Sequence, residues 1–132
     1  MMQFARRLFL VAGVYGILAL LPQYFLEARI GRDDPPPITH PEYFYGFIGV
    51  GLAWQVLFLI ISRDPSRYRL AMIPGMLEKL GFGGVAVILL FQHRIAPVTA
   101  GFGFVDLVLA LLFLIAFRRT APVAGGRVSM AG

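Results

Sequence analysis

The sequence predicts an all-α membrane protein in which four transmembrane helices form an antiparallel bundle. Hydrophobic residues make up 58% of the 132 residues and charged residues only 14%, a balance that is not typical of a water-soluble domain. The apolar residues form four runs of about twenty residues, the length of helix that crosses a bilayer core. The runs are continuous rather than alternating, which argues against a transmembrane β-barrel.

Polar or helix-breaking residues bound each predicted span. The spans are residues 8–25, 43–61, 70–92 and 98–117. Pro35–Pro37 interrupt any helix in the first loop, because each proline lacks a donor and bars its predecessor from the helical region. Asp64 and Pro65 are typical of a helix start before the third span. We therefore predict a single transmembrane domain over residues 1–119. We predict that residues 120–132, which follow this domain, form a flexible cytoplasmic tail, because they carry too little apolar surface to fold alone.

The distribution of basic residues predicts the orientation. Eight arginines fall on one side of the membrane and three on the other. The richer side comprises the N-terminus, the second loop and the tail, so we expect both termini in the cytoplasm. The expected location is a cell membrane, specifically the inner membrane of a bacterium. The net charge of +5 then belongs to the inner face and predicts contact with lipid headgroups. No motif for nucleic-acid binding is present.

Metal, cofactor and catalytic sites are not predicted. The chain has no cysteine, which excludes disulfides, thiolate metal sites and cysteine nucleophiles. His40 and His93 both fall on the predicted outer side, but their spacing matches no pattern of metal ligands. Ser62 and Ser66 have no histidine on their side of the membrane, so no serine triad is indicated. An enzyme that acts on a lipid is a remote alternative.

Small residues are expected to face the interior of the bundle, because close backbone approach drives helix packing in lipid. Each span carries such a stripe: Ala12, Gly16 and Ala19; Gly46, Gly49 and Ala53; Gly75, Gly83 and Ala86; Thr99, Gly103, Asp106 and Ala110. The second and third loops are short, which predicts that spans two, three and four are successive antiparallel neighbours.

Three charged residues lie inside the predicted spans: Glu78 and Lys79 on the third, and Asp106 on the fourth. Placing each of these charges in hydrocarbon costs roughly 3 kcal/mol, so each requires a partner or water. With a helical rise of about 1.5 Å per residue, the three lie at similar depths, and Tyr15 and Gln55 lie near the same level. We predict that these five residues form one polar layer and are the candidate ligand-binding residues, with Asp106 the strongest candidate.

Three interpretations of the polar layer are open. Asp106 and Lys79 could simply pair and fix the register of the helices. Alternatively, Asp106 and Glu78 could organise a site that binds or conducts a small ligand, a lipid or a proton. An acid could instead face a basic residue of another subunit, in a homo-oligomer or a larger membrane complex. The last interpretation predicts a non-catalytic subunit or assembly factor as the alternative function.

The second loop and the start of the third span carry a resemblance to a known family. Residues 63–69 read RDPSRYR and residues 72–79 read MIPGMLEK. With four spans in so short a chain, this pattern resembles small bacterial membrane proteins of the DoxX-like kind. The resemblance implies a compact four-helix bundle and, in some members, association with respiratory or sulfur-oxidising complexes. No catalytic residue of the family maps onto a position of this chain.

Overall fold

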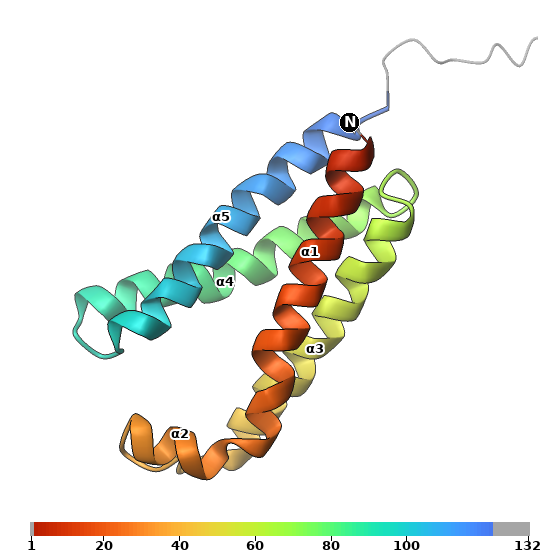
Figure 1. Ribbon diagram of the computed structural model, residues 1–132. Helices are drawn as coiled ribbons and strands as arrows, with labels where there is room; N and C mark the ends of the chain where they lie inside the picture. The colour runs from red at the N-terminus through yellow and green to blue at the C-terminus, as the bar shows by residue number, and fades with distance from the viewer. Residues whose placement is uncertain (1, 123–132) are drawn as a thin grey trace, which may run out of the picture.

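Four long helices dominate the computed structural model, which describes residues 2–122 (Figure 1). The elements in order are α1 (Met2–Leu20), η1 (Leu21–Phe25), α2 (Glu27–Asp33), α3 (Pro41–Arg63), η2 (Arg69–Ala71), α4 (Met72–Phe91) and α5 (Pro97–Arg119). Four helical segments are long and apolar enough to cross a membrane: Met2–Phe25, Pro41–Arg63, Arg69–Phe91 and Pro97–Arg119. The all-α prediction with four spans is confirmed. Beyond residue 122, the predicted tail lies outside the described residues.

Prolines and turn residues place the helix ends close to the predicted ones. Pro41 and Pro97 begin α3 and α5, where a first turn tolerates a missing backbone donor. The first span starts earlier than predicted, because Arg6 and Arg7 continue the helix although their hydropathy excludes them from an apolar run. The short helix α2 in the first loop was not predicted, because its polar residues show no apolar run.

The long helices pack as two antiparallel hairpins, α1 with α3 and α4 with α5 (Figure 1). The hairpins meet at the end that holds the N-terminus and the α3–α4 connection. They diverge toward the other end, which holds α2 and the α4–α5 connection. The prediction that α3 and α4 pack side by side along their length was wrong, because these two helices contact each other only over a short stretch. The turn after Asp64 and the segment η2 redirect the chain, so a short loop here does not impose side-by-side packing.

An aromatic core joins the hairpins where they meet. Its buried residues are Ala5, Phe9, Ala12, Phe58, Ile61, Met72, Phe113 and Ala116. The ring of Phe113 on α5 stacks on Phe9 of α1 at 4.3 Å between centroids and meets Phe58 of α3 edge-on at 5.1 Å. Because the three rings come from both hairpins, this cluster holds the two halves of the molecule together.

The contact between α4 and α5 depends on glycines at predicted positions. A Cβ at Gly103 would collide with the Cβ of Ala86, and a Cβ at Gly83 would lie 2.8 Å from the carbonyl oxygen of Gly103. The two backbones therefore approach as closely as the small-residue stripes of the third and fourth spans predicted.

For α3 the predicted stripe was wrong at two of its three positions, since only Gly49 faces a close neighbour, the hydroxyl oxygen of Tyr24. Gly46 has open space where a Cβ would stand, and Ala53 is exposed. The buried face of α3 instead carries Gly51, against which Leu20 of α1 packs, and Gln55. Small residues occur on more than one face of this helix, so their spacing alone did not identify the face that meets α1.

Gly103→Ala is expected to destabilise the protein by about 1–3 kcal/mol, because the added methyl group must force α4 and α5 apart. The measurement is reversible unfolding in mixed detergent micelles. Gly101→Ala is the matched control, since Gly101 lies on the same helix with nothing near its Cβ position, and it should leave stability nearly unchanged. Equal losses in the two variants would contradict the close packing of Gly103.

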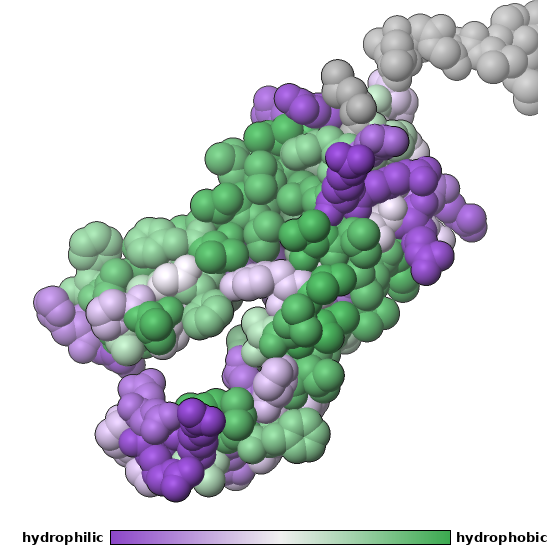
Figure 2. Space-filling view, viewed as in Figure 1, coloured by the Kyte–Doolittle hydropathy of each residue, from purple (hydrophilic) through white to green (hydrophobic). Residues whose placement is uncertain are grey.

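The outer surface of the long helices is largely apolar in the view of Figure 2, and polar residues gather at the two ends. Many large hydrophobic side chains are exposed along the helices, among them Leu18, Phe47, Ile88, Val98 and Leu111. A surface of this kind is typical of helices in contact with acyl chains.

Candidate functional site

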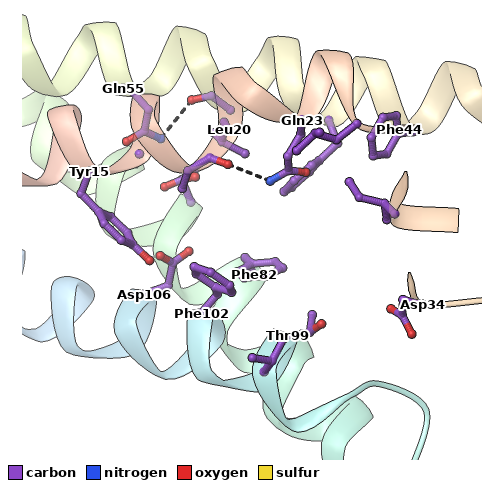
Figure 3. Close-up of a pocket in the computed structure, with 18 of the residues that line it drawn as sticks. Tyr15, Leu20, Gln23, Asp34, Phe44, Gln55, Phe82, Thr99, Phe102 and Asp106 are labelled. Carbon is purple, nitrogen blue, oxygen red and sulfur yellow. Dashed lines mark hydrogen bonds between the residues drawn. The ribbon is translucent and has the colours of Figure 1, made fainter. Parts of the chain in front are cut away.

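A pocket of about 600 Å³ lies between the diverging hairpins. Residues from all four long helices, from η1 and from α2 form its wall. All five residues of the predicted polar layer line it: Tyr15, Gln55, Glu78, Lys79 and Asp106. Figure 3 shows the pocket with side chains from both hairpins directed toward it. The structure thus brings together the residues that the sequence placed at one depth.

Lys79 is the centre of the polar layer. Its Nζ lies 3.4 Å from Oδ1 of Asp106 on the neighbouring helix and 3.6 Å from Oε2 of Glu78. The ammonium also lies 5.3 Å from the centroid of the Phe58 ring, within range of a cation–π contact. With only 3% of the residue exposed, Lys79 is committed to these partners and does not reach an end of its helix.

Asp106 faces the other helices, with 12% of its side chain exposed. It accepts a hydrogen bond from Lys79 across the α4–α5 contact. In Figure 3 the hydroxyl end of Tyr15, on α1, points toward the Asp106 carboxylate from the opposite hairpin. Asp106 therefore pairs with Lys79 and at the same time forms part of the pocket wall, and its predicted role in a ligand site stays a prediction.

Glu78 is the second acid of the layer, and its side chain is 21% exposed. Its Oε2 is buried and has no hydrogen-bond partner, because Lys79 Nζ lies beyond bonding distance. Two carboxylates share one ammonium, so the cluster of Glu78, Lys79 and Asp106 carries one net negative charge when all three groups are ionised.

Gln55 completes the layer from α3. Its Nε2 donates a hydrogen bond of 3.0 Å to the carbonyl oxygen of Gly51, while its Oε1 is buried without a partner. The side chain fits only because Gly16 of α1 has none, since a Cβ at Gly16 would collide with the amide of Gln55. The glycine predicted to pack helices thus also makes room for a buried amide.

Apolar side chains form much of the remaining wall. They are Ala19, Leu20, Leu26, Ile30, Phe44, Phe47, Phe82, Val98 and Phe102. Phe47 of α3 and Phe82 of α4 lie 6.1 Å apart between ring centroids, so aromatic rings from both hairpins flank the space. The pocket is consequently amphiphilic, with a charged region and an apolar region.

The helix α2 contributes a polar rim that sequence reasoning missed. Arg29, Asp33 and Asp34 line this part of the pocket, and Arg29 Nε lies 3.5 Å from Asp33 Oδ2. The spacing of Arg29 and Asp33 by four residues is typical of a helix pair. No signal in the sequence, however, indicated that the loop folds back beside the polar layer, because that depends on how η1 directs the chain.

The two histidines take no part in this pocket. His40 Nδ1 lies 3.4 Å from Oε1 of Glu42, and His93 has a positive φ of 57° at the end of α4. Neither residue lines the pocket. Within residues 2–122, no three His, Asp or Glu side chains lie close enough together to hold a metal ion.

Comparisons of this chain with protein-family models, with curated proteins and with solved structures found no match. The resemblance to DoxX-like proteins therefore stays a prediction. What carries the functional argument is the site itself: a membrane-spanning helical protein with a charged, partly apolar pocket between two hairpins.

Proposed function

We propose that this protein binds a small lipid-soluble molecule within the membrane, in the pocket between its two hairpins. The polar group of that molecule lies at the polar layer, and its apolar body lies along the phenylalanines. The observation that carries the proposal is a pocket of about 600 Å³ whose wall combines buried charges with aromatic side chains. Pockets of about 300–1,000 Å³ with a few polar groups in an apolar lining are typical of small-molecule sites.

A purely structural role for the charges is less well supported. A pair that only fixes helix register is best satisfied by its own partners, because unpaired buried polar groups are destabilising. Here Oε1 of Gln55 is buried without a partner. Oε2 of Glu78 is buried without a hydrogen bond and has only the Lys79 ammonium at 3.6 Å, which Glu78 shares with Asp106; both Gln55 and Glu78 line the pocket. Acceptors left open beside a cavity favour a site that is completed by something bound there.

Lateral access from the bilayer suits this arrangement. Figure 2 shows a notch between the two arms of the molecule, with apolar surface on the upper arm and hydrophilic residues on much of the lower one. A lipid-soluble molecule could enter by this route without crossing water. The arginine-rich inner loops support a mouth on the outer side, near α2. The bacterial inner membrane as the location stays a prediction. The alternative role, a non-catalytic subunit of a larger complex, stays a prediction.

Photolabelling tests the proposal. An octanol that carries a diazirine is added to the protein in phosphatidylcholine nanodiscs, and labelled residues are mapped by mass spectrometry. Labelling of pocket residues such as Phe82 and Phe102 should saturate and should be displaced by excess octanol. Ala19→Trp, which puts a large side chain on the pocket wall, should abolish the saturable component.

Ala53→Trp is the matched control, because Ala53 is exposed on α3 and does not line the pocket. It should leave saturable labelling unchanged. Labelling that is spread evenly over the lipid-facing surface, does not saturate and does not respond to Ala19→Trp would overturn the proposed function.

A further inference from the structure

We infer that the molecule bound in this pocket is a cationic amphiphile, with a protonated amine placed between Glu78 and Gln55 and an apolar chain along the aromatic wall. The inference rests on the proposed function and adds the chemical class of the ligand. Three features of the wall support it: its charge, its acceptors that lack a hydrogen bond and its aromatic rings.

The charge of the pocket wall is negative at both ends. In the polar layer, Glu78 and Asp106 share the single cation Lys79. At the rim, Arg29 pairs with Asp33, which leaves Asp34 in excess. The lining residues therefore hold four acids and two bases. A cation entering the pocket is attracted at both ends, and most strongly at the polar layer, where the side chains are largely buried and the dielectric constant is lower than at the exposed rim.

The two groups of the polar layer that lack a hydrogen bond are both acceptors. Glu78 Oε2 is a carboxylate oxygen, and Gln55 Oε1 is an amide oxygen held in place by the hydrogen bond from Nε2 to Gly51. Neither can be satisfied by a ligand that only accepts hydrogen bonds. A primary ammonium offers three donors and no acceptor, so it matches what is missing. Bonds from such a group to a carboxylate are stronger than neutral ones.

The cation that is already present shows how the wall accommodates positive charge. Lys79 lies beside two carboxylates of the wall and over the ring of Phe58, which belongs to the buried aromatic core and not to the pocket lining. Phe82 and Phe102 line the neighbouring part of the pocket. Aromatic faces attract cations, and their apolar surface accepts an alkyl chain. A fatty acid fits poorly, because its carboxylate would have to compete with Glu78 and Asp106 for Lys79.

Competition among matched amphiphiles tests the inference. Dodecylamine, dodecanol and dodecanoate are compared as competitors of the diazirine octanol in phosphatidylcholine nanodiscs, at equal concentrations in the membrane. Dodecylamine should compete at least about tenfold better than dodecanol, as expected for a charge-assisted hydrogen bond. Dodecanoate should be the weakest. This series needs only the wild-type chain, so it does not depend on whether a variant folds.

Glu78→Gln keeps the shape of the side chain and removes its charge, so it should erase most of the preference for dodecylamine while competition by dodecanol persists. Glu42→Gln is the control, because it makes the same substitution at an exposed position outside the pocket. It should keep the full preference. In a second arm of the experiment, phosphatidylethanolamine is added to the nanodiscs. Displacement of the probe by this lipid identifies a lipid headgroup as the source of the amine. If the lipid does not displace the probe, the amine belongs to a free molecule.

Two results would overturn the inference. If dodecanol or dodecanoate competes as well as dodecylamine, the ligand is not cationic, but the proposed binding function stands. If none of the three displaces the probe, the inference and the proposed function fail together.

Discussion

Replacing Lys79 by methionine is expected to lower the free energy of unfolding by about 3–5 kcal/mol. The substitution keeps much of the volume of the side chain but removes the only cation of the polar layer. The carboxylates of Asp106 and Glu78 then repel each other, because no ammonium lies between them and water reaches this part of the molecule poorly. The measurement is reversible unfolding in mixed micelles, followed by circular dichroism.

Two further variants isolate the effect. Arg63→Met removes a cation from an exposed position at the end of α3 and should change stability by less than about 0.5 kcal/mol. Adding Asp106→Asn to Lys79→Met should recover part of the loss, because one of the two stranded carboxylates is gone. A Lys79→Met protein as stable as Arg63→Met would contradict the ion-pair cluster.

Phe113→Ala is expected to lower the free energy of unfolding by about 3–5 kcal/mol, the range for deleting a buried aromatic side chain. The Phe113 ring is fully buried and contacts rings of both α1 and α3. Its removal leaves a cavity where the two hairpins meet and loses two aromatic contacts between them. Loss of stability should therefore be accompanied by loss of the fixed relation between the hairpins, which a spin-label distance between α3 and α5 would measure.

Phe104→Ala provides the comparison for Phe113→Ala. Phe104 lies on the same helix with half of its surface exposed, and it does not line the pocket. Its truncation should cost less than about 1 kcal/mol and leave the spin-label distance unchanged, because no cavity forms inside the protein. Equal effects of the two truncations would mean that the aromatic core does not join the hairpins.

The positions of the spans could be predicted from the sequence because the relevant physics is local. A bilayer requires about twenty apolar residues per helix, and prolines and charges mark where each helix ends. Predicted and observed spans differ by two residues or fewer, except at the start of α1. Arg6 and Arg7 are helical there, although their polarity removed them from the apolar run.

The members of the polar layer could also be predicted, because depth follows from counting residues along helices of known rise. Charges within spans must find partners, and Lys79 does reach Asp106. The rim residues Arg29, Asp33 and Asp34 could not be found in this way. Their place beside the pocket depends on where the first loop folds, and no single helix carries that information.

By itself, the sequence determined the number of membrane-crossing helices, their bounds except the start of α1, and the level at which five polar side chains stand, since helix rise and the hydrocarbon thickness set these quantities one helix at a time. Only the tertiary structure decided that α3 packs on α1 through Gly51 and Gln55, that α3 and α4 diverge, and that a pocket opens between the hairpins. The reason is that interhelical packing in lipid is decided by the fit between small residues on particular faces, and α3 offers several such faces of similar composition.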